Sequence, residues 1–209
     1  MKVGTKSVLF GAHCFFIHPI FVFAAWCKLY GFPWDPRLWV AFFVHDIGYW
    51  GKPNMDGDEG ETHPEMGADI MCWLFDFPKA LFVDTGKLSN DQLLKWTLFT
   101  KYHSRFLAKK EGAKPSRLCF ADKLSICLEP SWLYLPRVNW SGEIHEYMSQ
   151  AKNGDGKYKS MDISTINQKR WFADVCNYLE RWVEEHKDGR EDSWTPEAKK
   201  AITRSGVWQ

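Results

Sequence analysis

Signals that begin and end helices recur along this chain, whereas alternating apolar and polar runs between hairpin turns are hard to find. Asp35 followed by Pro36, for example, supplies a capping side chain and a first-turn proline for a helix that runs to about Asp46. From Gly48 to Glu61 the chain is rich in glycine and acidic residues, which indicates a surface loop. The pattern predicts an all-α fold.

The same signals place the other helices and bound the domain. Helices are expected over Val8–Trp26, after the capping boxes Thr62–Glu65 and Ser89–Gln92, from Pro115–Ser116, around Trp171–Trp182 and from Thr195–Glu197. The helix after Ser89 is expected to reach about Ala108 and to contain His103. A length of 209 residues fits one domain, residues 1–209, with a core at about 5–136 and a helical annex at about 137–209.

The stretch from Val8 to Trp26 is apolar enough to imitate a membrane span or a signal peptide. His13 and His18 interrupt it, and a hydrocarbon core penalises an imidazole that has no partner. No small-residue cleavage site follows Trp26, so we expect a buried helix in a soluble, cytoplasmic protein. Six scattered cysteines without a C-x-x-C pair are interpreted as reduced core residues.

Acidic and basic residues nearly cancel, 26 against 27, which leaves a formal net charge of +1. A nearly neutral protein has no long-range field to attract double-stranded nucleic acid or an anionic membrane. Neither is therefore expected as a partner, and a phosphate group must be bound by a local arrangement of charges.

His45 and Asp46 end the apolar run Val40–Val44. A carboxylate beside such a wall is costly to bury unless a cation or hydrogen bonds compensate its charge. Taken alone, the dipeptide is more typical of a surface pair at a helix end. His18 and Asp122, however, also stand where the apolar pattern calls for hydrophobic residues. Imidazole nitrogens and carboxylate oxygens together suit divalent zinc, iron, manganese, cobalt or nickel.

The order His18, His45-Asp46, Asp122 resembles the H…HD…D pattern of the HD superfamily of metal-dependent phosphohydrolases. The resemblance covers Val8 to Pro130 and includes the segment HPIFVFAAWCKLYGFPWDPRLWVAFFVHDIGYW, the element HPEMGA and the motif ADKLS. It implies an HD-type helical bundle with a C-terminal helical extension, and these four residues as metal ligands.

His63 in HPEMGA and His103 in KYHSR fall where some members of the superfamily recruit two further histidines for a second metal. The resemblance therefore implies one or two divalent ions. ADKLSICLEP is most similar to the diadenosine tetraphosphate hydrolases, whereas the paired histidine and Gly-Tyr-Pro turn of the cyclic-dinucleotide phosphodiesterases are missing. Because Pro19 disfavours helical geometry at His18, His13 is the alternative ligand if His18 is displaced.

The resemblance further implies hydrolysis of a phosphate ester or anhydride, with a nucleotide as the favoured small-molecule substrate. A metal lowers the pKa of bound water, so that hydroxide can attack phosphorus near neutral pH. Asp46 is the expected bridging ligand and catalytic residue. Further candidates are Lys52, Arg105 and Lys123 for substrate binding, Glu65 as a leaving-group acid, and Tyr49 and Trp50 for stacking on a base.

Two other functions remain open. The same six-ligand pattern resembles di-iron oxygenases that cleave carbon–phosphorus or carbon–carbon bonds, and the ligand set does not separate the two chemistries. A nucleotide-binding or sensing module without turnover is the third hypothesis, with Trp171, Trp182 and Trp194 as a partner surface, although aromatic residues at helical spacing are more often core. A homo-oligomer is compatible with each of the three.

Overall fold

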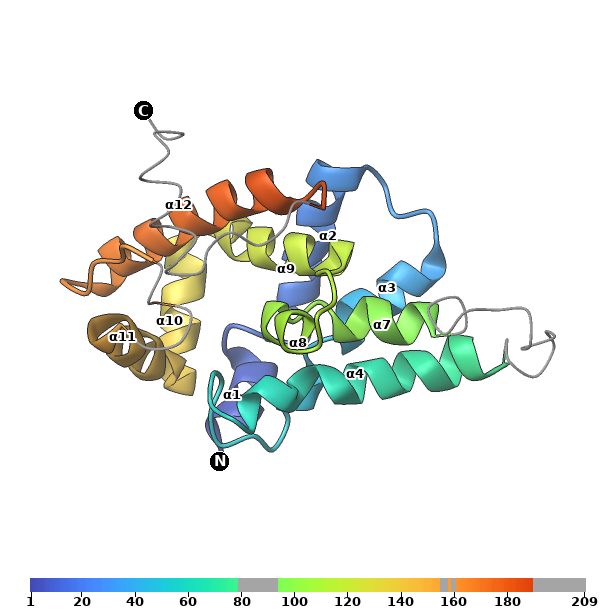
Figure 1. Cartoon of the computed structure of the whole chain (residues 1–209). Helices are drawn as coiled ribbons and strands as arrows, with labels where there is room; N and C mark the ends of the chain where they lie inside the picture. The colour runs from blue at the N-terminus through green and yellow to red at the C-terminus, as the bar shows by residue number, and fades with distance from the viewer. Residues whose placement is uncertain (79–93, 155–157, 159–160, 190–209) are drawn as a thin grey trace.

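The computed structural model describes residues 1–78, 94–154, 158 and 161–189, which form ten α-helices and no β-strand (Figure 1). The all-α prediction is therefore confirmed. The helices are α1 (Val3–Phe10), α2 (His18–Tyr30), α3 (Pro36–Val44), α4 (His63–Met71), α7 (Lys95–Lys101), α8 (Arg105–Lys110), α9 (Arg117–Leu128), α10 (Ser131–Ser141), α11 (Glu143–Asn153) and α12 (Gln168–His186). The helix starts expected at Ser89–Gln92 and Thr195–Glu197 lie outside the described residues, as does Trp194.

The apolar N-terminal stretch forms two helices, so the single helix expected over Val8–Trp26 is wrong. α1 ends at Phe10, the chain turns at Gly11, and α2 begins at His18. Pro19 then occupies the first turn of α2, where a missing N–H costs no helical hydrogen bond. The proline therefore starts the helix and does not displace His18.

Capping side chains explain where two other helices begin. Asp35 Oδ1 accepts a hydrogen bond from the backbone N–H of Arg37 at 3.0 Å, which caps α3 as predicted. Ser104 caps α8 in the same way, because its Oγ accepts from the N–H of Leu107 at 3.2 Å. The helix expected to continue through His103 is consequently broken, and His103 lies in the turn between α7 and α8.

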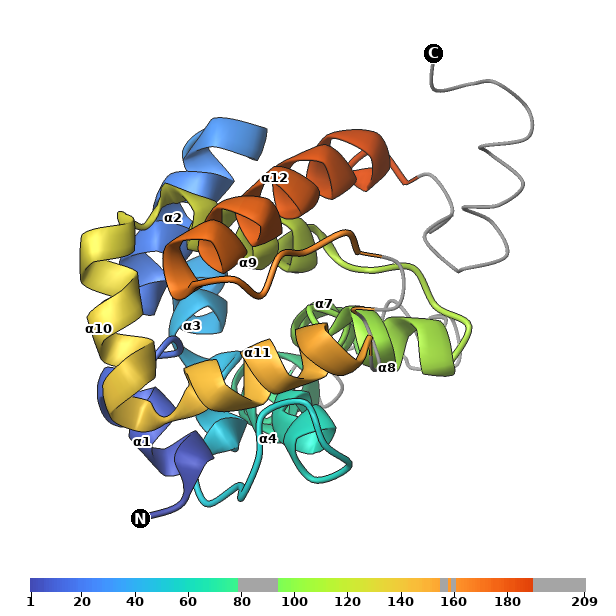
Figure 2. The same ribbon diagram turned by 90° about the vertical axis from the view of Figure 1, so that its left-hand side faces the viewer.

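The larger apolar core joins α2, α3, α4, α7, α9 and α12. α2 and α12 both pack against α9, and α4 runs along α7 (Figures 1 and 2). Its buried large side chains include Trp26, Phe42, Met71, Trp96 and Trp182. Burial of one such side chain stabilises the fold by about 1.5–3 kcal/mol.

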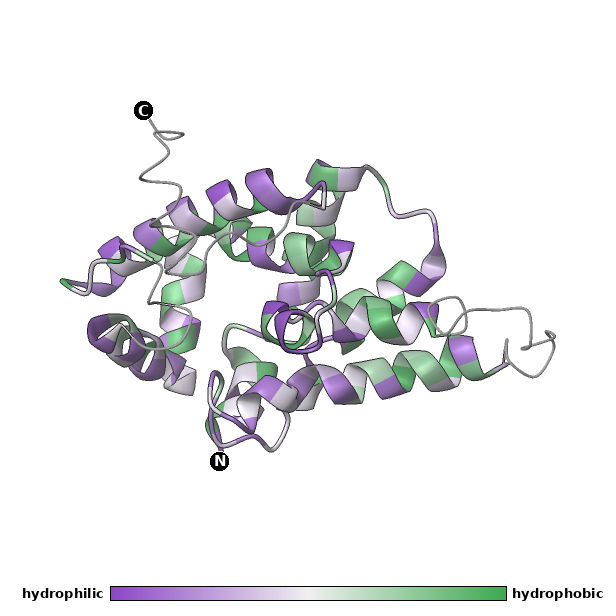
Figure 3. Cartoon of the chain, in the orientation of Figure 1, coloured by the Kyte–Doolittle hydropathy of each residue, from purple (hydrophilic) through white to green (hydrophobic). Residues whose placement is uncertain are grey.

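A second apolar cluster joins α1 to α10, α11 and the first turns of α12. Val8 meets Val138, Ile144 and Trp171 there. Many residues of α11 and α12 are hydrophilic (Figure 3). The buried residues of both helices are mostly apolar, so the two helices face the core with their apolar sides. The C-terminal helices thus pack directly on the N-terminal segment. Over the described ranges, no helix is long and apolar enough to cross a bilayer.

Candidate metal centre

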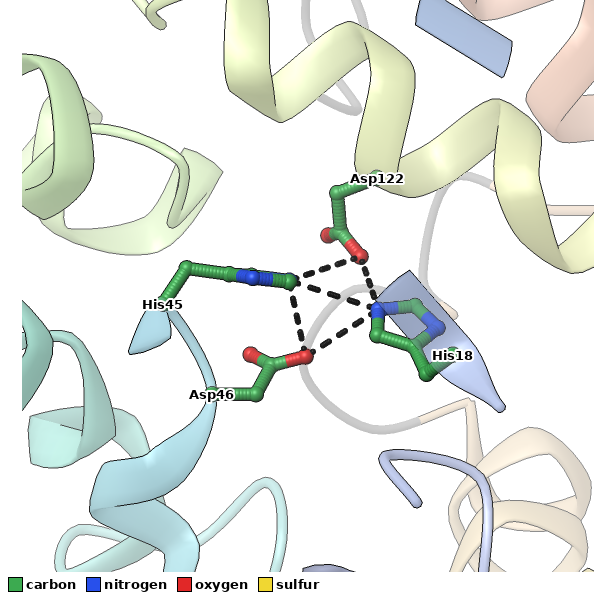
Figure 4. A group of neighbouring side chains, drawn as sticks. All are labelled: His18, His45, Asp46 and Asp122. Carbon is green, nitrogen blue, oxygen red and sulfur yellow. Dashed lines mark hydrogen bonds and ion pairs between the residues drawn. The ribbon is translucent and has the colours of Figure 1, made fainter. Parts of the chain in front are cut away.

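Four buried side chains from separate helical segments converge at one point (Figure 4). His18 is the first residue of α2, His45 and Asp46 follow the end of α3, and Asp122 lies within α9. His18 Nε2 lies 3.1 Å from Asp122 Oδ1 and 3.2 Å from Asp46 Oδ2. His45 Nε2 lies 3.0 Å from Asp46 Oδ2 and 3.3 Å from His18 Nε2. We call these four residues the first group.

A second group uses the other oxygen of the same carboxylate. His103 Nε2 lies 3.2 Å from Asp46 Oδ1, and His63 Nε2 lies 3.5 Å from it. The two imidazole nitrogens are 3.1 Å apart, and all three side chains are buried. Asp46, His63 and His103 form the second group, so Asp46 is common to both groups.

Backbone carbonyls orient three of the imidazoles. Each Nδ1 lies at hydrogen-bond distance from a carbonyl oxygen three residues earlier: His45 to Phe42 at 3.0 Å, His63 to Gly60 at 2.8 Å, and His103 to Thr100 at 2.6 Å. Because a carbonyl oxygen only accepts, Nδ1 carries the proton in the neutral ring and Nε2 presents a lone pair. The lone pairs therefore point into the two groups.

This arrangement of donor atoms fits divalent metal ions. The Nε2 atoms of His18 and His45 lie 3.3 Å apart, and those of His63 and His103 lie 3.1 Å apart. Two neutral rings that both present lone pairs have no proton to share at such a distance, whereas a metal ion can accept both lone pairs. Asp46 Oδ2 is buried and forms no hydrogen bond to the described residues, although two imidazole nitrogens surround it. Burial of a carboxylate oxygen without a hydrogen bond costs free energy unless a nearby cation compensates its negative charge. Nitrogen and oxygen ligands of this kind are those of transition-metal sites, so both groups could hold a metal ion.

Two glycines allow the segments that carry these ligands to approach each other. A Cβ atom on Gly48 would overlap the carbonyl oxygen of His63. A Cβ atom on Gly67 would lie 2.5 Å from the carbonyl oxygen of Val44, directly before His45. The close approach of α4 to the end of α3 therefore requires residues without a side chain at these positions.

In the metal-free protein the buried charges compensate one another. Burial by itself would lower the pKa of His45, but Asp46 and Asp122 raise it to about 10. Burial would raise the pKa of Asp46, yet His45 and the neighbouring histidines hold it well below its usual value. His63 differs, because burial and the nearby His103 keep its pKa well below the ordinary range. The two carboxylates of the first group therefore favour positive charge on the neighbouring imidazoles.

The candidates for substrate binding and acid catalysis lie in different surroundings. Lys123 is half-buried, with Nζ 2.8 Å from Asp122 Oδ2, and Lys52 Nζ donates to Thr62 Oγ1 at 2.5 Å, next to His63. Arg105 instead contacts α12: Nη1 donates to the Tyr178 hydroxyl at 3.0 Å, and the guanidinium lies 4.8 Å from the centre of the Trp182 ring. Glu65 is exposed on α4 and belongs to neither group.

Tyr49 does not border an opening, in contrast to its expected role in stacking on a base. Its ring is buried and stacks on His63, with ring centres 3.8 Å apart and an angle of 11°. The aromatic face thereby packs against an imidazole of the second group. Trp50 is 52% exposed, so its ring remains accessible.

A small pocket lies beside the first group. Its polar lining consists of His13, His18, His45 and Asp46, and its apolar walls are Val8, Phe15, Pro19, Phe42, Phe43 and Ile47. His13, the alternative ligand, is therefore a neighbour of the first group and not a member of it.

Sequence patterns missed the partner of His13, which is Glu143 at the start of α11. This carboxylate is fully buried, and the glutamate was not distinguishable from the other charged residues of the annex. The sequence shows only a glutamate directly after Gly142, which ends α10, and this gives no sign of burial.

Comparisons with protein-family models, with curated proteins and with solved structures give no match. The fold and the site therefore define an all-helical protein with two buried groups of histidine and aspartate that are suited to metal ions.

Proposed function

We propose that this chain is a metal-dependent phosphohydrolase of the HD superfamily, acting on a nucleotide or a related phosphate ester or anhydride. The observation that carries the proposal is the single carboxylate, Asp46, that serves two buried groups of imidazoles. Divalent ions bound there would lower the pKa of a water molecule and offset charge on phosphoryl oxygens. Six ligand side chains in the order of the superfamily's motif support the two-metal branch.

Positive side chains next to the ligands support a phosphorylated substrate. Lys123 touches Asp122, and Lys52 touches Thr62, the residue before His63. We assign both to the binding of phosphoryl oxygens. Arg105, whose guanidinium lies against Trp182 of α12, is the third residue assigned to substrate binding.

The proton for the leaving group is assigned to Glu65, which is exposed on α4 two residues after His63. Glu65→Gln should then slow hydrolysis while metal content stays unchanged.

A hydrolysis screen tests the proposal. Wild-type protein, His45→Ala and Asp46→Ala are supplied with each candidate metal and offered nucleoside mono-, di- and triphosphates and dinucleotides. Asp69→Ala, which removes an exposed carboxylate of α4, is the matched control. We expect turnover by wild type and control, and a loss of about 100-fold or more in the ligand variants. Equal rates in all four proteins would contradict the proposal.

Oxidative cleavage of a carbon–phosphorus or carbon–carbon bond by iron in the same groups is the second candidate. The nitrogen and oxygen donors of both groups support it as well as they support the hydrolase, because they also suit iron. Strictly anaerobic assays separate the two functions, since a hydrolase needs no oxygen and an oxygenase consumes it with substrate. Tight nucleotide binding without turnover under any metal would instead indicate a binding module.

A further inference from the structure

His13 is the histidine of the pocket that belongs to neither metal group. Its Nδ1 lies 2.8 Å from Ser7 Oγ and 3.6 Å from Glu143 Oε2. The side chain is 16% exposed and its ring faces that of Tyr49, with ring centres 4.6 Å apart. His13 is thus held from one edge, by residues of α1 and α11.

Glu143 sits in a cradle built to hold a carboxylate. It is fully buried, and it accepts hydrogen bonds from the backbone N–H of Ala12 at 3.0 Å, from Ser141 Oγ at 2.5 Å and from the Tyr147 hydroxyl at 3.1 Å. A Cβ atom on Gly11 would overlap Glu143 Oε1, so the turn before His13 leaves room for this carboxylate. The position of Glu143 is therefore fixed from several sides.

The carboxylate of Glu143 lies on the Nδ1 side of the His13 ring, together with the hydroxyl of Ser7. Burial by itself would raise the pKa of Glu143, but the nearby imidazole of His13 and the hydrogen bonds from Ser141 and the N–H of Ala12 lower it below its usual value. An ionised carboxylate only accepts hydrogen bonds, so it favours a proton on Nδ1 of His13. Nε2 of the neutral ring then presents a lone pair, and it makes no hydrogen bond to any residue that the structure describes.

A partner for this nitrogen would have to lie in the small pocket that His13 lines. His13 lines it together with His18, His45 and Asp46, while the remaining walls are apolar. A water molecule or substrate hydroxyl held there has few other hydrogen-bond partners besides the residues of the first group. An acceptor on the ring of His13 would fix its orientation.

We propose that His13 is a catalytic residue whose Nε2 accepts a hydrogen bond from the attacking water in the pocket, and that Glu143 is the positioning residue that orients its ring. This inference rests on the proposed hydrolase function. It assigns the C-terminal annex a part in the site, because Glu143 begins α11.

Two substitutions of His13 separate the roles of its nitrogens. In His13→Asn the amide can replace Nδ1 next to Ser7 and Glu143, but nothing replaces Nε2; in His13→Gln the amide oxygen can reach the position of Nε2. We expect His13→Asn to lower kcat about 100-fold with unchanged KM and metal content, and His13→Gln to recover part of the loss. His145→Asn, an exposed histidine of α11, is the matched control. Wild-type kcat in His13→Asn would overturn the proposal.

Nuclear magnetic resonance of ¹⁵N-histidine-labelled, zinc-loaded protein gives a readout that needs no turnover. We expect His13 to carry its proton on Nδ1, a mixture of tautomers in Glu143→Gln, and a shift of the Nε2 signal when inorganic phosphate is added. The role of His13 would be overturned if the wild type carried the proton on Nε2, or if the chemical shift of Nε2 did not change when phosphate was added. If the wild type hydrolyses no substrate, the hydrolase proposal fails, while these spectra still decide whether His13 faces the ligand.

Discussion

The two oxygens of Asp46 face different imidazole pairs, and this division has a consequence for each ligand. Oδ2 lies beside His18 and His45, whereas Oδ1 lies beside His63 and His103. Removal of a residue that belongs to one group should therefore spare the other, and removal of Asp46 should affect both.

Metal analysis of single variants tests this division. We expect Asp122→Ala to lose the ion of the first group and His103→Ala to lose that of the second, so that each retains about half of the wild-type metal content. Asp46→Ala should lose both ions, and Asp69→Ala neither. Equal metal content in Asp46→Ala and the wild type would show that Asp46 is not a shared ligand.

The pKa shifts predict that metal binding releases protons. Because the pKa of His45 is raised to about 10, its imidazole is protonated at neutral pH in the metal-free protein, and a ligand nitrogen must be deprotonated. Affinity for the first ion should accordingly rise with pH from 6.5 towards 10. His63 contributes no such proton, since its pKa is lowered. Calorimetry in buffers of different ionisation enthalpy measures the release, and a heat that is independent of the buffer would contradict the assignment.

At the scale of the elements, the ligands occupy helix ends and turns more often than helix interiors. His18 begins α2, His45 and Asp46 follow α3, His63 begins α4, and His103 lies between α7 and α8. The sequence singles out His18, Asp46 and Asp122 because each is polar within an apolar pattern, and it includes His63 and His103 only through the family resemblance. It predicts less well which helix or turn carries each residue. The helix expected to contain His103 is interrupted there, because Ser104 caps α8. Such a side-chain cap competes with continuation of the helix within one or two residues.

The contact between the end of α3 and α4 should not tolerate a methyl group. In Gly48→Ala the new Cβ atom would overlap the His63 carbonyl oxygen, so the two segments must separate. We expect a loss of about 1–3 kcal/mol in the free energy of unfolding, together with weaker metal binding. Denaturant titration and metal titration check the two effects, with Asp69→Ala as the control. Unchanged affinity at reduced stability would show that the ligands adapt to a wider spacing.

At the scale of the whole molecule, the ligands join segments that are far apart along the chain. His18 and Asp122 are separated by 104 positions, yet their ligand atoms lie 3.1 Å apart. An ion bound between them would link α2 to α9 and to the end of α3, which are also the helices of the larger apolar core. Metal binding and stability of the fold should therefore be coupled.

Removal of the metal should lower the melting temperature. A ligand at 100 times its Kd stabilises the native state by about 2.7 kcal/mol. We expect a chelator to lower the Tm of the wild type and added metal to restore it, as scanning calorimetry would record. Asp46→Ala should melt at the same temperature with and without chelator. A chelator response in that variant equal to the wild type would place the ion elsewhere.

The all-helical class was predictable from local pattern, whereas the burial of Glu143 beside His13 was not. Glu143 is buried because α10 packs against α1 and brings the start of α11 to the turn after α1, where Ala12 donates to a residue 131 positions away. No local pattern encodes such a separation. The same reason hides the stacking of Tyr49 on His63, which depends on how the loop between them folds back.

A shared carboxylate also makes the two groups thermodynamically linked. Whatever factor the first ion applies to the affinity for the second, the second ion must apply the same factor in return. Occupancy would then respond to the supply of either metal as a joint property of the pair. If the two groups held different metals, the fraction of protein with both ions bound would depend on both free metal concentrations. The metal in shorter supply would then limit that fraction.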